Sequence, residues 1–198
     1  GTDNVKGGSG ADTIKINSAG QGNADTLDGG AGTSDILQLS AGSHSFTDNS
    51  KLANIETIKG HASSATTVDL TGQLEILKVD GGSAGDTITG GNANDIITGG
   101  GGNDIIAGGA GDDSLTGNAN DDTFKVDGGT DTITDLATGD IVVVSNSAKA
   151  QATGITSFVA TSDTKIISGT AEFTAASGGG TINPVSYTHL RAHETLIY

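Results

Sequence analysis

The sequence predicts an all-β fold built as a stack of short, repeated layers. Three observations support this: 33 of the 198 residues are glycine, only 3% are aromatic, and a nine-residue period runs through the middle of the chain. With no Cys, Met or Trp, the chain has little material for a compact globular core. Stacked repeats need only small apolar residues in each layer, which suits this composition.

From residue 81 the chain divides into consecutive nonapeptides of related sequence. Each unit opens with Gly, carries Asp at position six and an apolar residue at position eight. The phase continues in two looser units, with Asp131 before Ile133 and Asp140 before Val142. The five regular units begin at Gly81, Gly90, Gly99, Gly108 and Gly117, with Asp86, Asp95, Asp104, Asp113 and Asp122 at position six and Ile88, Ile97, Ile106, Leu115 and Phe124 at position eight.

Each half of the nonapeptide has a physical role. The glycine-rich first half fits a tight turn, because Gly and, to a lesser degree, Asn readily adopt positive φ. The second half, such as Asp95-Ile-Ile-Thr98, fits a short strand whose position-eight side chain points inward. One nonapeptide then makes half a turn of a coil, and units two apart stack as parallel strands about 4.8 Å apart.

This stacking places the position-six aspartates in rows. Carboxylates at strand spacing repel each other unless a cation lies between them. Ca²⁺ fits this role because it accepts about six to eight oxygen ligands in flexible geometry, whereas Mg²⁺ demands a stricter octahedron. The glycine turns would add carbonyl oxygens. The expected rows are Asp86 with Asp104 and Asp122, and Asp95 with Asp113 and Asp131.

The pattern G-G-x-G-x-D-x-U-x resembles the calcium-binding nonapeptide repeat of the RTX family. The resemblance is strong over residues 81–125 and looser to 143. It implies a right-handed parallel β-roll with Ca²⁺ in both rows of turns, and export from a Gram-negative bacterium by type I secretion machinery. The metal-binding residues that it implies are Asp86, Asp95, Asp104, Asp113, Asp122, Asp131 and Asp12, together with Gly82, Gly91, Gly100, Gly102, Gly109 and Gly111.

Some turns depart from the pattern. Ala84 and Ala93 stand where a turn glycine is expected, and an alanine with positive φ would be strained. We therefore expect weaker sites there. Asn118 and Asn120 replace two glycines in the fifth unit, and their carbonyls can still serve as ligands.

The repeats divide the chain into regions. Residues 1–39 are expected to form a short repeat block, in which Asp12 belongs to a full unit that begins at Gly7. Residues 40–80 lose the glycine turns but keep strand-like alternation. They are expected to be a solenoid spacer held by apolar packing, with His44 and His61 as surface or turn residues. Residues 81–143 form the main calcium-binding roll with its closing strands, and 144–184 a Thr/Ser/Ala-rich β segment without a readable role.

Neither end of the chain is expected to be natural. The sequence contains no methionine and opens on the second half of a repeat unit, which indicates a fragment of a larger secreted or surface-layer-like bacterial protein. Residues 185–198 resemble translated sequencing adapter and are expected to be an artefact. We therefore give His189, His193 and Glu194 no metal or catalytic role.

The charge balance narrows the class of function. Nine basic residues against 24 acidic ones, a net charge of −15, argue against nucleic acid and anionic membranes as partners. The absence of Cys excludes disulfides and thiolate metal sites, and no apolar run is long enough to span a bilayer. A flexible linker would not place an apolar residue at every ninth position, and identical aspartates do not make one acid/base pair.

These features predict a protein that is not an enzyme. Calcium binding by the Gly/Asp-rich turns would drive folding of an extracellular structural or adhesive repeat protein. The alternative is the C-terminal export and folding module of an RTX toxin, protease or lipase whose active domain lies upstream. Expected partners are calcium ions, the type I secretion machinery, and a cell-surface partner or a second copy of the chain. The expected location is outside the cell or on its surface.

Overall fold

The fold was analysed in a computed structural model, which describes residues 2–20, 25–145, 148–155, 157–159, 165–166, 170–175 and 181–183. All regular elements in these ranges are β-strands, and every strand pair is parallel. The predicted parallel β-roll is therefore confirmed. The adapter-like segment 185–198 lies outside the described residues.

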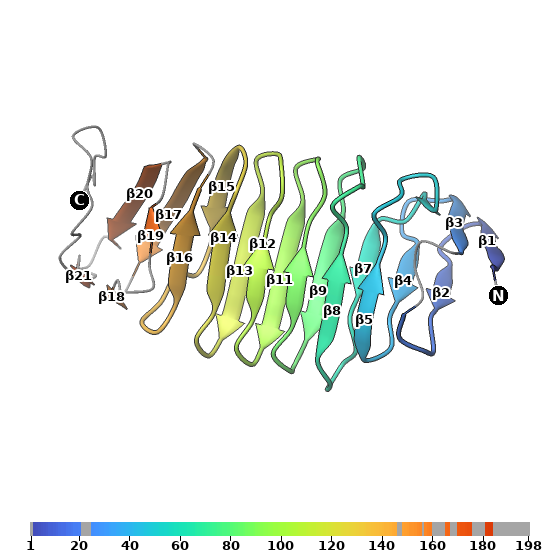
Figure 1. The fold of residues 1–198 in the computed structure, drawn as a ribbon, viewed down its shortest axis with the longest axis horizontal. Helices are drawn as coiled ribbons and strands as arrows, with labels where there is room; N and C mark the ends of the chain where they lie inside the picture. The colour runs from blue at the N-terminus through green and yellow to red at the C-terminus, as the bar shows by residue number, and fades with distance from the viewer. Residues whose placement is uncertain are drawn as a thin grey trace.

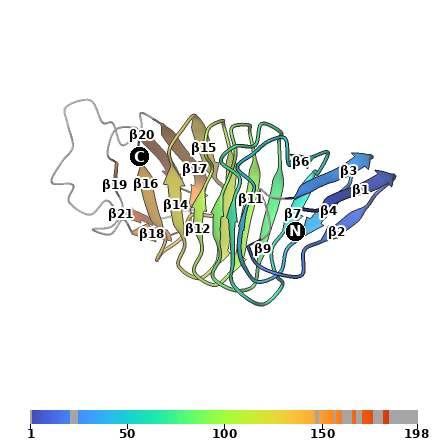
Figure 2. The ribbon, with the colours of Figure 1, turned by 45° about the vertical axis from the view of Figure 1, so that its right-hand side comes forward.

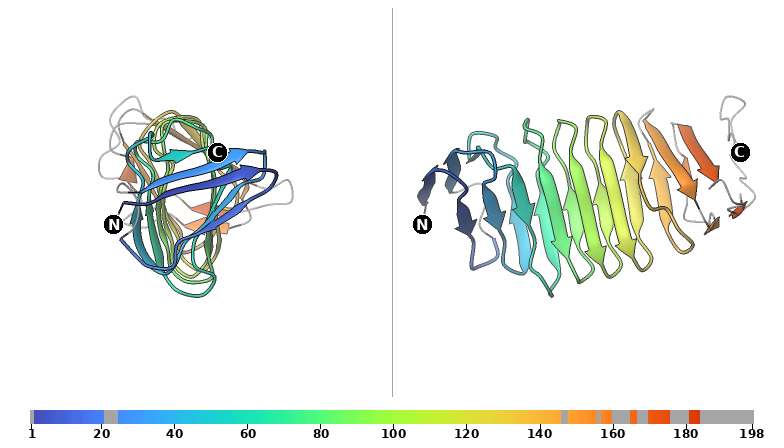
Figure 3. Two further views of the ribbon diagram at one scale, coloured as in Figure 1. Left: turned by 90° about the vertical axis from the view of Figure 1, so that its right-hand side faces the viewer. Right: turned by 180° about the vertical axis from the view of Figure 1, so that it is seen from behind.

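The chain winds into an elongated coil whose strands lie across its long axis (Figure 1). Two long sheets form its walls. Seen along the axis, the strands of successive turns superpose (Figure 3, left). The nine-stranded sheet contains β2 (Thr13–Lys15), β4 (Ile36–Gln38), β7 (Thr57–Lys59), β9 (Lys78–Gly82), β11 (Ile96–Gly101), β13 (Ser114–Ala119), β15 (Thr130–Ile133), β17 (Lys149–Ile155) and β20 (Thr170–Ala175). The seven-stranded sheet contains β5 (Gly42–Ser45), β8 (Thr66–Asp69), β10 (Thr87–Thr89), β12 (Ile105–Ala107), β14 (Thr123–Val126), β16 (Ile141–Val144) and β19 (Lys165–Ile166).

Two smaller sheets lie at the ends of the coil. The three-stranded sheet is N-terminal, beside the first strands of the nine-stranded sheet (Figure 2). The two-stranded sheet is C-terminal. Their strands are β1 (Asn4–Ser9), β3 (Thr26–Ala31) and β6 (Leu52–Ala53) at the N-terminal end, and β18 (Ser157–Val159) and β21 (Thr181–Asn183) at the C-terminal end.

The inward side chains form one apolar column on each long sheet, because alternate residues of a strand point to the same face. In the repeats the column is made by position eight, with Ile88 paired to Ile106 and Ile97 to Leu115. These four side chains are at most 1% exposed. The predicted inward role of position eight is confirmed.

A second inward position, two residues further along each strand, differs between the regions. In the central repeats it is glycine, as at Gly90 and Gly108. Outside them it is a buried apolar residue at some turns, such as Leu70 and Val126, and glycine at others, such as Gly29 and Gly60. The central turns therefore contain less apolar side chain than the flanking turns in which an apolar residue fills this position.

His44 corrects one expectation. It lies on β5 in register with Val68, at the inward position, and is 1% exposed. Its Nε2 is 3.0 Å from the carbonyl oxygen of Ser40, and its Nδ1 has no hydrogen-bond partner. His44 is thus a core residue and not a surface one. His61 is half-buried in a turn, where its Nδ1 accepts a 3.3 Å hydrogen bond from Ser63 N.

The long sheets pass without interruption through residues 40–80, because β7 and β9 pair with each other and β8 pairs with β5 and β10. The strands expected to close the roll, β15 and β16, lie inside the stack and pair on their outer sides with β17 and β19. None of the described elements is a helix that could cross a membrane.

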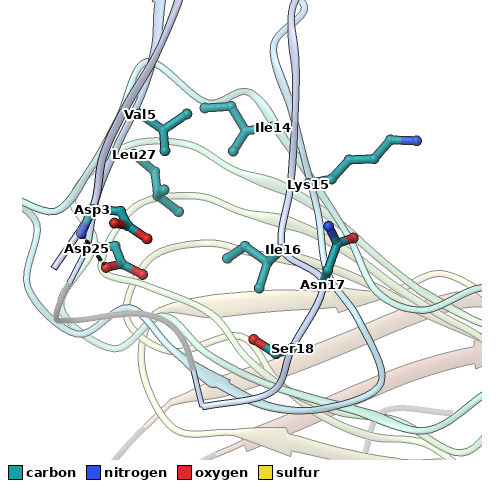
Figure 4. A pocket seen from close by; sticks show the side chains of 9 residues that line it. All are labelled: Asp3, Val5, Ile14, Lys15, Ile16, Asn17, Ser18, Asp25 and Leu27. Carbon is teal, nitrogen blue, oxygen red and sulfur yellow. Dashed lines mark hydrogen bonds between the residues drawn. The ribbon is translucent and has the colours of Figure 1, made fainter. Parts of the chain in front are cut away.

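The N-terminal end of the coil opens into a hollow of about 240 Å³. It lies between the first strands and has a mixed lining of apolar and polar side chains (Figure 4). The lining residues are Asp3, Val5, Ile14, Lys15, Ile16, Asn17, Ser18, Asp25 and Leu27. Val5 is 37% exposed there, whereas Leu27 on the next turn is 3% exposed. The first turn therefore covers its apolar residues less completely than the turns that follow.

Candidate metal centre

The position-six aspartates lie at the turn-to-strand junctions, where each turn enters the next strand. Asp86, Asp104 and Asp122 directly precede β10, β12 and β14 of the seven-stranded sheet. Asp95 and Asp113 directly precede β11 and β13 of the nine-stranded sheet, and Asp131 lies in β15. All six are at most 2% exposed. The two rows predicted from the nine-residue period are confirmed.

Hydrogen bonds link each row from turn to turn. Asp104 Oδ1 accepts from the backbone N–H of Asp86 at 2.7 Å, and Asp122 Oδ1 accepts from that of Asp104 at 2.8 Å. In the other row, Asp113 Oδ1 accepts from Asp95 N at 2.7 Å. Residues joined in this way are 18 positions apart, which is one complete turn of the coil.

In most of these residues the second carboxylate oxygen, Oδ2, is buried and accepts no hydrogen bond. Asp95 Oδ2 accepts a 2.8 Å hydrogen bond from Gly91 N. Buried Oδ2 atoms without any hydrogen-bond partner belong to Asp12, Asp35, Asp86, Asp104, Asp113 and Asp131. A buried carboxylate oxygen without a partner is unfavourable, and a cation would satisfy it.

The glycine at position one makes room for this oxygen. A Cβ on Gly99 would lie 2.2 Å from Asp104 Oδ2, and a Cβ on Gly108 would lie 2.2 Å from Asp113 Oδ2. Neither glycine has positive φ. Position one therefore requires glycine for space and not for conformation, which differs from the reason expected from the sequence.

Positive φ occurs at positions two and four instead. Gly82, Gly100 and Gly109 at position two, and Gly102 and Gly111 at position four, have φ between 93° and 139°. Gly91 does not. Asn118 and Asn120 take the same conformation, with φ of 72° and 86°, as expected for Asn.

Ala84 and Ala93 correct the expectation of strained turns. Neither has positive φ, so alanine carries no backbone penalty at these places. The Ala93 carbonyl oxygen lies against the next turn, 2.6 Å from where a Cβ on Gly111 would be. These turns keep their carbonyl oxygens close to the neighbouring turn.

Burial and mutual repulsion act together on the carboxylates. Loss of hydration on burial raises the pKa of Asp104 and Asp113 to about 6, that of Asp122 to about 7 and that of Asp131 to about 8. Hydrogen bonds from backbone amides oppose this rise, and neighbouring carboxylates add to it. The rows thus hold carboxylates that are poorly stabilised as anions by the protein alone.

These residues fit calcium better than a metal that prefers several side-chain ligands. Among the residues that the structure describes, no group of three or more His, Cys, Asp or Glu side chains could hold a metal ion. A cation in the rows would need backbone oxygens beside the carboxylates. Mixed carboxylate and carbonyl ligands are typical of calcium sites.

Comparison with family models gives the decisive match. The model of the RTX calcium-binding nonapeptide repeat matches in four copies, over residues 1–15, 18–38, 80–115 and 101–133. The chain carries RTX calcium-binding repeats. Such repeats bind calcium ions, and both long sheets of this roll contain them. No curated protein and no solved structure gave a significant match.

The matched RTX repeats and the turn that follows them contain further carboxylates that the sequence reasoning did not place among the ligands. Asp35 is fully buried, and its Oδ1 accepts from Asp12 N at 2.7 Å. Asp140, just beyond the last match, accepts from Asp122 N at 3.0 Å. The phase of the repeat could have found Asp140. The insertion before Asp35 hid its equivalence to Asp12, which is half-buried in the N-terminal block.

One short motif in the RTX region has the letters of a hydrolase nucleophile elbow, G-x-S-x-G, at residues 81–85. That elbow requires a turn from a strand into a helix. Here the segment runs from β9 into a turn of the roll, and the Ser83 hydroxyl donates a 2.7 Å hydrogen bond to the Ala62 carbonyl. A calcium-binding repeat roll is typically non-catalytic, and Ser83 has a structural role in the turn.

Proposed function

We propose that calcium binding to the two aspartate rows drives folding of this RTX roll, in an extracellular structural or adhesive repeat protein. The observation that carries the proposal is the series of buried Oδ2 atoms without partners, repeated along both rows. The proposed ligands are the aspartates at positions 12, 86, 95, 104, 113, 122 and 131 and the carbonyls of the glycines at positions 82, 91, 100, 102, 109 and 111.

The chain's own residues perform three tasks in this proposal. The backbone amides of one turn fix Oδ1 of the next, so that each carboxylate has a defined orientation. The position-one glycine leaves space for Oδ2, and the position-two and position-four residues turn the backbone. A bound calcium ion supplies the positive charge that balances the carboxylates.

The same arrangement explains why the chain would stay unfolded at low calcium. Its net charge is −15, and folding without a cation moves ionised carboxylates out of water. Coupling of metal binding to folding follows, because the ligands are brought together only in the folded coil. A chain that folds only where calcium is plentiful suits export, and RTX repeat proteins are generally secreted.

Two repeat regions joined by a spacer that continues the same sheets favour an extended structural or adhesive protein. The alternative, an export and folding module of a toxin, protease or lipase, places the activity in another domain. The longer reading frame separates the two: further repeats support the first, and a catalytic domain supports the second. A Gram-negative origin and the type I secretion machinery remain part of the proposal.

A calcium titration of the full chain, followed by far-ultraviolet circular dichroism, tests the folding proposal. We expect a cooperative gain of β structure with calcium and not with equimolar magnesium. The D104N/D122N variant keeps the Oδ1 acceptors but loses two charged oxygens, so its midpoint should rise at least about tenfold.

The matched control is D48N/E75Q, which removes two carboxylates from exposed positions and should titrate like the parent. If the chelated chain already shows the complete β spectrum, the folding proposal is wrong. In that case calcium has only a secondary, stabilising role.

A further inference from the structure

Glu56 occupies a position-six place in the nine-stranded sheet although it lies outside every matched repeat. Strands β4 and β7 pair with Ile36 opposite Thr57, so the residues before them, Asp35 and Glu56, follow each other in the same column. The family matches end at residue 38 and resume at residue 80. Glu56 therefore continues the N-terminal aspartate row into the spacer.

The contacts of Glu56 repeat those of the position-six aspartates. Glu56 Oε2 accepts a 2.7 Å hydrogen bond from Asp35 N, as Asp104 Oδ1 does from Asp86 N. The backbone N–H of Glu56 donates in return to the Asp35 carbonyl oxygen at 3.2 Å. Glu56 is thus bonded to Asp35 through its carboxylate and through its backbone.

Asp35 supplies the second, independent observation. Its side chain is fully buried, and its Oδ2 has no hydrogen-bond partner. This oxygen lies beside Gly29 and Gly32, where a Cβ would be 2.8 Å and 3.0 Å from it. The unsatisfied oxygen is held in a space that two glycines keep open.

A backbone oxygen faces the same space. A Cβ on Gly29 would lie 1.9 Å from the Asn54 carbonyl oxygen, on the same side as Asp35 Oδ2. Asn54 presents that carbonyl from a left-handed conformation, with φ of 53°. Its side chain is anchored by a 2.7 Å hydrogen bond to Asp28 Oδ1. The turn before Glu56 therefore contributes an oriented neutral oxygen.

We infer that Glu56, Asp35 and the Asn54 carbonyl form a divalent-cation site of the calcium type at the boundary of the spacer. The inference rests on the proposed calcium function and extends it beyond the repeat motif. The next place in the column belongs to Leu77, which directly precedes Lys78, the residue that pairs with Thr57. Leu77 is 1% exposed. Glu56 is consequently the last carboxylate of the N-terminal row.

The test compares E56Q with the parent chain and with E75Q by isothermal titration of calcium alone into the full chain. Gln keeps an oxygen that accepts from Asp35 N–H but carries no charge. Glu75 is exposed in the same spacer, so E75Q removes the same charge without touching the site. We expect E56Q to bind one calcium ion fewer, or to weaken one site at least about tenfold, and E75Q to match the parent.

A third variant, E56A, separates ligand from positioning residue. If only the hydrogen bond to Asp35 matters, E56A alone loses stability and E56Q binds calcium like the parent, which overturns the inference. If E56Q loses its β spectrum even in saturating calcium, the role is structural and the inference is again wrong. If the parent chain binds no calcium, the proposed function itself is wrong. If the parent binds calcium and E56Q binds it equally well, only the inferred site at Glu56 is wrong.

Discussion

The six position-six aspartates of the two rows, from Asp86 to Asp131, combine two roles in one side chain. Oδ1 acts as a fixed acceptor for the amide of the preceding turn, and in four of these six residues Oδ2 is buried without a partner. The first role holds the coil together and the second makes it depend on a cation or a proton. Asn can replace the first role and not the second, which is why Asp-to-Asn changes separate folding geometry from calcium dependence.

The raised carboxyl pKa values predict an acid-stabilised roll when calcium is absent. The pKa of Asp131 is about 8 in the folded chain and that of Asp122 about 7, against an ordinary value of 3.8. Protonation of these groups therefore favours folding. The contribution is complete below about pH 4 and is lost as the pH rises through the folded values of about 6 to 8.

Far-ultraviolet circular dichroism in calcium-free buffer checks this expectation. The β content should be higher at pH 5 than at pH 8, and saturating calcium should remove most of the difference. D131N lacks the carboxyl with the highest pKa and should show a weaker pH dependence. A β content that rises from pH 5 to pH 8 in the calcium-free parent chain would contradict the burial argument.

At the scale of the turn, two glycines of the same unit play opposite roles. A Cβ on Gly99 would collide with Asp104 Oδ2 at 2.2 Å, whereas a Cβ on Gly101 would meet nothing closer than 3.4 Å. Neither has positive φ, so backbone conformation does not separate them. The difference between the two positions is the space reserved for the carboxylate.

The variants G99A and G101A test whether Gly99 is needed to leave space for the Asp104 carboxylate. We expect G99A to destabilise the calcium-loaded roll by about 1–3 kcal/mol and to weaken calcium binding. G101A should be neutral or stabilising by about 0.4–1 kcal/mol, because it restricts the unfolded chain. Denaturant unfolding at saturating calcium measures both. Equal effects of the two substitutions would show that space for Asp104 does not matter.

The strands and turns were predictable to different degrees. Aspartates equivalent to Asp104 and apolar residues equivalent to Ile106 recur every nine residues. The aspartate row, the inward apolar column and the parallel stacking of strands therefore follow from the period alone. Glu56 could not be found in this way, because it follows no glycine loop and lies 21 residues from its partner Asp35 instead of 18. His44 was misplaced because only the pairing of β5 with β8 reveals that it faces inward.

Over the whole molecule, the apolar content of the turns predicts where calcium matters most. In the central repeats the second inward position is glycine, as at Gly99 and Gly108, whereas Leu39, Leu70 and Val144 fill it at the ends of β4, β8 and β16. A fully buried Leu or Val contributes about 1.5–3 kcal/mol. The flanking turns therefore retain stabilisation that the central ones lack.

Hydrogen exchange with mass spectrometry should reveal this gradient. At calcium concentrations below saturation, amides of β10 to β13 should exchange faster than those of β4, β8 and β16, and saturating calcium should slow the central strands most. The D48N/E75Q variant serves as a reference with an unchanged pattern. Uniform protection along the coil at these calcium concentrations would mean that the glycine positions do not weaken the centre.

The orientation of the strands has a mechanical consequence. Because they lie across the long axis (Figure 1), the hydrogen bonds between turns run along that axis, and so do the links between Oδ1 and the amides. A pull on the two ends loads the turns in series, so the coil opens one turn at a time and not by shearing whole sheets. The glycine-filled centre would yield first at low calcium. A tether built from this coil would thus change its breaking force with the calcium around it.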